Sequence, residues 1–314
     1  MTFDVSSIPA ETARRFDVAV EDGVTIAVYE LNDRPIDAPI LLWGHANGFS
    51  AGSYLPFLQI LAEHFHVFAF DVRGQGASSR PPEPLSKTVA FDRFAHDMEG
   101  VTNTIQRMAI SKPLYFAGHS FSAATMYHLG GNFGFAPWRA VTTFDATMRP
   151  SDHQDVMDFY AKRPSMSAGA LRRRRFFDTP EAYLEAMSRP HAFGFFAPEM
   201  LTAHCQATLQ RRRDSTNGWE LSCPPEIEAA TYEAVGRTTA PYDSLARFPV
   251  KAHLVGADPA APGGSWIGQL HEAFAQKLPN GRYTKLTGCG HLMPFQKPKA
   301  CADIVISMLG VTTP

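Results

Sequence analysis

The chain alternates between short apolar runs and longer segments whose apolar residues recur with helical spacing. Gly23–Leu31 alternates like a partly exposed strand. Near-continuous apolar runs, typical of strands buried on both faces of a parallel sheet, occur at Pro39–Trp43, His66–Phe70, Leu114–Ala117, Ala140–Phe144 and Ala252–Val255. Helix-like stretches lie between or after them, at Tyr54–Glu63, Phe91–Met108, Ser120–Leu129, Ile267–Lys277 and Lys299–Met308. This order predicts an α/β fold with a doubly wound, mostly parallel sheet.

The strand–helix alternation stops after Asp145 and resumes at Val250. Between them, from Pro150 to about Phe248, the pattern indicates helices and loops with several proline breaks. A long helical insertion between two core strands is expected to form a cap. We therefore predict a core built from residues 1–149 and 249–314, with a helical cap at residues 150–248.

The amino-acid composition argues against nucleic acid and membranes as binding partners. The 314 residues carry 29 Lys+Arg against 31 Asp+Glu, and a net charge of -2 gives no electrostatic case for nucleic acid or an anionic membrane. No apolar stretch reaches the length of about 18 residues expected of a membrane span. The N-terminal segment lacks the apolar core of a secretory signal, and none of the four cysteines forms a C-x-x-C pair. We expect a cytoplasmic protein with reduced thiols and a small-molecule substrate, whose oligomeric state stays open.

The first candidate for chemistry is the segment Gly118-His119-Ser120-Phe121-Ser122. It closes a predicted buried strand and opens a helix, a turn that projects a serine hydroxyl above the sheet, beside the helix N-terminus. Small residues are needed two positions before and after the serine, and Gly118 and Ser122 meet that need. Ser120 is the predicted nucleophile. The alternative is an ordinary strand-to-helix loop in which Ser120 only caps the helix.

The predicted base is His291, in Gly288-Cys289-Gly290-His291, which follows the last predicted strand, Tyr283–Leu286. A carboxylate must fix the tautomer of such a base. Asp258 lies just past the end of a buried strand, where open α/β sheets build their sites. Alternatively, Asp258 only forms a turn, as aspartate before proline commonly does. Asp145, at the end of the preceding core strand, is the rival acid. We favour Asp258 because it comes after the cap and before the histidine.

Two glycine-containing loops complete the pattern. Gly44-His45-Ala46-Asn47-Gly48 follows an early strand, and a backbone N–H of this loop can supply an oxyanion donor, with Phe121 N–H as the second. The alternative for this loop is a plain Asn-Gly turn. The second loop, Asp71–Ser78, contains a G-x-G but runs into a proline-rich stretch. It is interpreted as a structural turn rather than a dinucleotide-binding motif.

Taken in order, these segments resemble the α/β-hydrolase superfamily, in its esterase- and lipase-like members with a helical cap. The resemblance spans about residues 23–309 and implies Ser120, Asp258 and His291 as a catalytic triad. It also implies the amides of Asn47 and Phe121 as oxyanion donors. Ser122 departs from the family pattern, which has glycine at that position.

The expected activity is hydrolysis of a carboxylic ester or similar acyl substrate through an acyl-enzyme. No zinc motif of the H-E-x-x-H type is present, and neither a metal nor a cofactor is expected. Two other hypotheses stay open: carbon–carbon bond hydrolysis by the same triad, and a non-catalytic ligand-binding protein that keeps the fold. For the arginines Arg172–Arg175 of the cap, surface ion pairing is favoured over binding of a substrate carboxylate.

Overall fold

A computed structural model describes residues 8–32, 37–109, 111–153, 165–212, 217–264 and 266–310. Its main element is an eight-stranded sheet in the order β1-β2-β4-β3-β5-β6-β10-β11, counted over the described residues. The strands are β1 (Ala13–Ala19), β2 (Thr25–Leu31), β3 (Ile40–Gly44), β4 (His66–Phe70), β5 (Leu114–His119), β6 (Ala140–Phe144), β10 (Lys251–Ala257) and β11 (Gly281–Leu286). From β4 to β11 the neighbours pair in parallel, whereas β1 and β2 are antiparallel. The predicted doubly wound sheet is confirmed.

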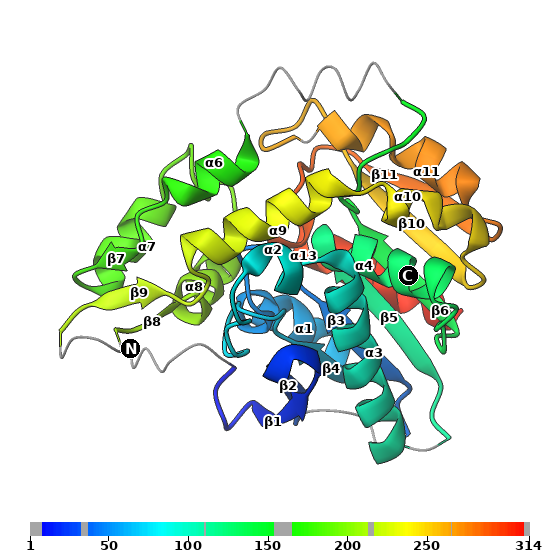
Figure 1. The fold of residues 1–314 in the computed structure, drawn as a ribbon, viewed down its shortest axis with the longest axis horizontal. Coiled ribbons are helices and arrows are strands. Elements are labelled where there is room, and N and C mark those ends of the chain that lie inside the picture. Colours follow the sequence, from blue (N-terminus) through cyan, green and yellow to red (C-terminus); the bar gives the residue numbers. More distant parts are fainter. Residues whose placement is uncertain are drawn as a thin grey trace.

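Helices cover both faces of this sheet (Figure 1). On one face lie α3 (Phe91–Met108), α4 (Phe121–Asn132) and α11 (His271–Lys277), and on the other lie α1 (Leu55–Ala62) and α13 (Pro298–Ile306). Each face has its own buried apolar cluster because the parallel strands are apolar on both sides. Shorter helices, α2 (Leu85–Thr88) and α12 (Met293–Gln296), lie in the connecting loops. In the part of the chain that the structure describes, no helix has the length and hydropathy needed to cross a bilayer.

The segment between β6 and β10, called the insertion below, contains the helices α6 (Met166–Leu171), α7 (Pro180–Met187), α8 (Pro198–Ala207), α9 (Pro225–Arg237) and α10 (Ala240–Asp243). It also holds a small antiparallel sheet, β7-β9-β8, formed by β7 (Phe176–Phe177), β8 (Leu209–Arg211) and β9 (Trp219–Leu221). Figure 1 shows most of the insertion, in green and yellow, to one side of the main sheet. The insertion is mainly helical, as expected, but three short strands that the sequence did not predict also pair within it. Helix α10 packs on α4 of the core.

The strand β1 was not predicted from the sequence. Its polar residues Arg14 and Arg15 obscure the alternation, and only its first and sixth residues are buried. It pairs with β2 at the edge of the sheet, where Arg14 forms an ion pair with Glu30 at 2.5 Å. An edge strand of this kind is stabilised by its partner rather than by its own apolar pattern.

Candidate active site

The turn that carries Ser120 joins β5 to α4. Strand β5 ends at His119 and α4 begins at Phe121, so one residue makes the turn. Its backbone has φ 56° and ψ −112°, a conformation that residues with a side chain rarely adopt. A hydrogen bond from Ser120 N to Phe144 O, 2.8 Å long, ties the turn to β6. The structure thus places Ser120 in the sharp strand-to-helix turn expected from the sequence.

Tight packing explains the small residues around this turn. A Cβ atom at Gly118 would lie 2.7 Å from a phenylalanine ring of β5, so glycine is required there. At the position where the family pattern has glycine, the hydroxyl of Ser122 donates to His45 O at 2.6 Å. A Cβ atom at Gly44 would lie only 2.6 Å from Cβ of Ser122. Glycine on β3 therefore makes room for serine on α4.

His291 lies in the loop after β11, and its ring contacts a buried carboxylate. The distance from Nδ1 to Oδ2 of Asp145 is 2.5 Å. The second carboxylate oxygen, Oδ1, accepts a hydrogen bond from Ala257 N at 2.9 Å. Asp145 directly follows β6 and is fully buried. This contact favours a proton on Nδ1 of the imidazole and leaves Nε2 available to accept one.

A second histidine, His271 at the start of α11, lies on the other side of the same carboxylate. Its Nδ1 is 3.1 Å from Oδ1 of Asp145, and its Nε2 donates to Ala146 O at 3.1 Å. Burial raises the pKa of the Asp145 carboxyl, but His271 and His291 lower it more, so the net pKa falls below the ordinary value. The group is ionised at neutral pH. Nothing in the sequence around His271 singled it out.

The predicted contact between Asp258 and His291 is absent, and this expectation was wrong. Asp258 Oδ2 accepts from Gly288 N at 3.0 Å, and its Oδ1 accepts from Ala260 N at 3.1 Å. The reason is the relative length of two strands. Strand β10 continues two residues beyond its pairing with the end of β6. Gly256 is therefore level with Asp145, Ala257 N reaches the Asp145 carboxylate, and Asp258 lies further along the chain. Asp258 instead braces the turn that precedes His291.

The loop of residues 44–48, in which the sequence predicts an oxyanion donor, has most of its backbone polar groups held by hydrogen bonds. Ala46 N donates to Tyr54 Oη at 3.2 Å, and Gly48 N donates to Gln75 Oε1 at 2.8 Å. Among the described residues, the N–H of Asn47 between them has no hydrogen-bond partner. The N–H of Phe121, the first residue of α4, has none either, as expected for the first turn of a helix.

His45 holds this loop as a neutral side chain. Its Nε2 accepts from Val72 N at 2.9 Å, so Nδ1 carries the proton and donates to Ala46 O at 2.7 Å. Burial lowers the pKa of His45 to about 4, which keeps the ring uncharged. The side chain of Asn47 adds a link to the insertion, because Nδ2 donates to Glu228 O at 3.0 Å.

His119, the residue before Ser120, links the His291 loop to Tyr54 through hydrogen bonds. Its Nε2 donates to the carbonyl oxygen of His291 at 2.8 Å, and its Nδ1 accepts from Tyr54 Oη at 2.7 Å. The same Tyr54 oxygen accepts from Ala46 N. Burial and the nearby His291 lower the pKa of His119 to about 3. The sequence did not predict these hydrogen bonds of His119, here called the His119 relay, although His119 belongs to the Gly118–Ser122 motif.

The Asp71–Ser78 loop has the structural role expected of it. The carboxylate of Asp71 accepts hydrogen bonds from Ala51 N at 2.7 Å and Ala77 N at 2.8 Å. A Cβ atom at Gly76 would lie 2.2 Å from that carboxylate. The loop of residues 71–78 thereby holds Ala51, which follows the loop of residues 44–48.

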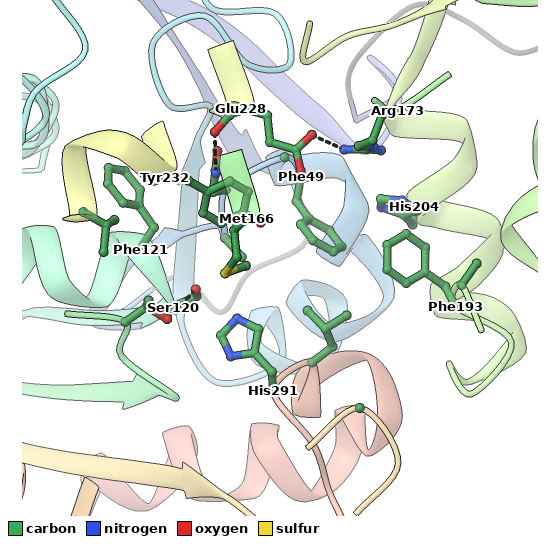
Figure 2. Close-up of a pocket in the computed structure, with 18 of the residues that line it drawn as sticks. Phe49, Ser120, Phe121, Met166, Arg173, Phe193, His204, Glu228, Tyr232 and His291 are labelled. Atoms are coloured by element: carbon green, nitrogen blue, oxygen red, sulfur yellow. Dashed lines mark hydrogen bonds and ion pairs between the residues drawn. The ribbon is translucent and has the colours of Figure 1, made fainter. Parts of the chain in front are cut away.

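A cavity of about 560 Å³ connects these groups (Figure 2). It is lined by both core and insertion, and the main lining residues are Asn47, Phe49, Ser120, Phe121, Thr147, Met166, Arg173, Phe193, His204, Glu228, Tyr232, Ile267 and His291. The size is ordinary for a small-molecule site. Among the described residues, no group of three or more His, Cys, Asp or Glu side chains could hold a metal ion.

The eight-stranded sheet with helices on both faces, and the sharp turn from β5 to α4, are those of an α/β-hydrolase fold. The chain belongs to the alpha/beta hydrolase family, whose model matches residues 40–304. No curated protein matches the chain in sequence.

Solved structures share the fold at low identity. The E-2-(acetamidomethylene)succinate hydrolase is 15% identical, with a TM-score of 0.75 over 95% of this chain and 100% of its own. A thermophilic esterase from Thermogutta terrifontis, solved with malate bound, is 18% identical, with a TM-score of 0.65 over 95% and 98%. The enol-lactonase from Burkholderia xenovorans LB400 is 18% identical, with a TM-score of 0.63 over 94% and 100%.

Proposed function

We propose that the protein is a serine hydrolase that cleaves a carboxylic ester or related acyl substrate through an acyl-enzyme. Ser120 is the nucleophile, His291 the general base and Asp145 the acid that orients it. The observation that carries the proposal is the 2.5 Å contact between His291 Nδ1 and the buried Asp145 carboxylate, in a cavity that Ser120 also lines. The fold relatives that are named as an esterase and an enol-lactonase agree with acyl chemistry.

The reaction follows from these positions. Ser120 Oγ attacks the carbonyl carbon as its proton passes to His291 Nε2, and Asp145 stabilises the imidazolium. The leaving oxygen then takes that proton. Water attacks the acyl-enzyme with His291 as base, which releases the acid and returns the proton to Ser120. At rest Ser120 Oγ shares a 3.1 Å hydrogen bond with Thr147 Oγ1, so attack requires the hydroxyl to turn toward His291.

The negative charge that develops on the carbonyl oxygen needs donors. Asn47 N–H and Phe121 N–H are proposed for this role because neither has a partner among the described residues and both residues line the cavity. Preorganised donors of this kind usually contribute about 3–4 kcal/mol each to the transition state. The residues of the insertion that line the cavity act as a cap over the substrate in this proposal.

A fluorophosphonate probe tests the proposal. We expect it to label Ser120, identified by peptide mapping, and we expect Ser120→Ala to abolish both labelling and hydrolysis of 4-nitrophenyl esters. Loss of a triad nucleophile costs on the order of 10⁶ in kcat. Circular dichroism and the melting temperature serve as controls for folding. Labelling of a different serine, or none in folded protein, would favour a ligand-binding protein that keeps the fold.

A further inference from the structure

Two histidine rings contact the Asp145 carboxylate, but the catalytic steps above use only one of them. His291 Nδ1 lies 2.5 Å from Oδ2, and His271 Nδ1 lies 3.1 Å from Oδ1. His271 is the first residue of α11, which packs on β10 and β11 (Figure 1). The side chains of His271 and Asp145 are both fully buried. The charge of this second ring therefore bears directly on the acid of the proposed triad.

Both ring nitrogens of His271 lie close to oxygen atoms that accept protons and do not donate them. Nε2 is 3.1 Å from the carbonyl oxygen of Ala146, so Nε2 carries a proton and donates it. Nδ1 is 3.1 Å from Asp145 Oδ1, outside the geometry of a straight hydrogen bond, and it is buried from solvent. Without a proton, Nδ1 would bury a lone pair beside a carboxylate oxygen, with nothing to offset the repulsion. The two oxygens therefore favour a ring that is protonated on both nitrogens.

The Asp145 carboxyl group is the alternative location for this proton, and its own contacts argue against it. Oδ1 already accepts a hydrogen bond from Ala257 N at 2.9 Å, and Oδ2 faces His291 Nδ1. Burial raises the pKa of the Asp145 carboxyl, but His271 and His291 lower it more, so the net pKa falls below the ordinary value. The carboxyl group is therefore ionised, and the proton belongs to His271.

The other titratable groups around α11 are uncharged or exposed. The helix packs against β10, β11 and two short 3-10 helices, η3 (Leu245–Arg247) and η4 (Trp266–Gln269). Burial raises the pKa of Tyr283 on β11, so its phenol is uncharged at neutral pH. Lys285 on β11 and Glu272 on α11 are exposed, where solvent and salt screen their opposite charges. The remaining titratable residues of these elements are Arg247, Lys251, His253, Lys277 and Arg282, none of which is classed as buried. In the described part of the chain, the buried charge next to His271 is thus that of Asp145.

We propose that His271 is an imidazolium in the resting protein, and that its charge lets His291 remain a neutral base at lower pH than the Asp145 carboxylate alone would allow. The carboxylate attracts the proton that His291 takes from Ser120. A cation beside the other carboxylate oxygen offsets part of this attraction, so His291 is protonated only in more acidic solution. His271 is a positioning residue, because it acts through Asp145. Its protonation stands by itself, whereas its effect on His291 rests on the proposed hydrolase function.

Nitrogen NMR of protein labelled with ¹⁵N-histidine tests the charge of His271 directly. An imidazolium shows two protonated ring nitrogens, whereas a neutral ring shows one protonated and one unprotonated nitrogen. We expect the imidazolium pattern for His271 at about pH 7.5, where an ordinary histidine with a pKa of about 6.5 is mostly neutral. The signals of His271 are assigned by their loss in His271→Gln. An unprotonated nitrogen at His271, or the lack of any imidazolium in the unmodified protein at this pH, overturns the proposal.

The pH dependence of Ser120 labelling tests the effect on His291. The second-order rate constant for the fluorophosphonate should fall in acid as His291 takes up a proton. His271→Gln keeps a donor for Ala146 O but removes the charge, so we expect this acid limb to move to higher pH by about one unit. The rate constant at about pH 5, relative to that at about pH 8, should then be about tenfold lower than in the unmodified protein. A purely structural role of His271 would instead lower the rate constant by the same factor at every pH.

His253→Gln is the matched control. His253 lies on β10, and its Nε2 is 2.9 Å from the hydroxyl of Thr284 rather than from a carboxylate. Its acid limb should coincide with that of the unmodified protein. In folded His271→Gln, an unmoved limb, or one that moves to lower pH, contradicts the effect on His291. Should His271→Gln fail to fold, His271→Asn, which keeps an uncharged amide near Asp145, replaces it in both experiments.

The two experiments also separate this inference from the proposed function. Folded protein that is not labelled at Ser120 refutes the hydrolase function, and the NMR spectrum still decides the charge of His271. Protein that is labelled at Ser120 but has a neutral His271 keeps the hydrolase and refutes this inference alone.

Discussion

Replacement of Asp145 by asparagine tests the most specific contact in the site. Ala257 N–H donates to one oxygen of this carboxylate at 2.9 Å, and His291 Nδ1 lies 2.5 Å from the other. In Asp145→Asn, the amide oxygen must face Ala257, because the amide NH₂ cannot accept that hydrogen bond. The NH₂ group then points at Nδ1 of His291 and forces the ring proton onto Nε2. The histidine can no longer accept the proton of Ser120.

The expected loss in kcat is up to about 10⁴, which corresponds to about 5 kcal/mol of transition-state stabilisation. The assay is hydrolysis of 4-nitrophenyl acetate under saturating conditions, with the melting temperature measured alongside. Asp258→Asn is the matched control. Asp258 braces a loop through Gly288 N and Ala260 N and touches no ring, so its loss should stay below about tenfold.

The reasoning fails if the two variants behave the other way round. A mild Asp145→Asn and a severe Asp258→Asn would mean that the functional acid is not the one in contact with His291. Equal and severe losses with unchanged melting temperatures would show that both carboxylates act on the histidine, the second through the position of its loop.

Other expectations follow from buried groups. Burial lowers the pKa values of His45, His119 and His204 to about 4, 3 and 3, below the value of about 6.5 in an unfolded chain, so the unfolded chain binds more protons as the pH falls. The unfolding free energy, measured with urea, should therefore decrease below pH 6.5, and these three groups together contribute at most about 4 kcal/mol per pH unit. A flat profile from pH 7 to 5 contradicts neutral burial. His119→Gln keeps both relay contacts and should lower kcat little, whereas His119→Leu should lower kcat about tenfold at constant KM; equal effects argue against the relay. Gly44→Ala should cost about 1–3 kcal/mol in thermal stability, with partial recovery on adding Ser122→Gly, and no recovery would place the clash elsewhere.

The sequence identified the sheet because its strands are apolar on both faces. It singled out Ser120, His291 and the loop of residues 44–48 as candidates because each stands in a short motif. The predicted contact between Asp258 and His291 failed for a different reason. Both Asp145 and Asp258 follow a core strand, and the lengths and register of β6 and β10 decide which carboxylate contacts the histidine. Register depends on long-range pairing, which no local pattern contains. His271 was missed for the same reason, since it approaches the carboxylate from a helix far along the chain.

The position of the insertion has a consequence for how such a protein can change over evolutionary time. The chain leaves the core directly after β6 and re-enters it at β10, and these two strands are hydrogen-bonded neighbours. The insertion therefore begins and ends at neighbouring strands, and the pairing of β6 with β10 holds its two ends together. Its length and content can be exchanged while Ser120, Asp145 and His291 keep their spacing. The residues that face Ser120 across the cavity can then be replaced without any change to Ser120, Asp145 or His291.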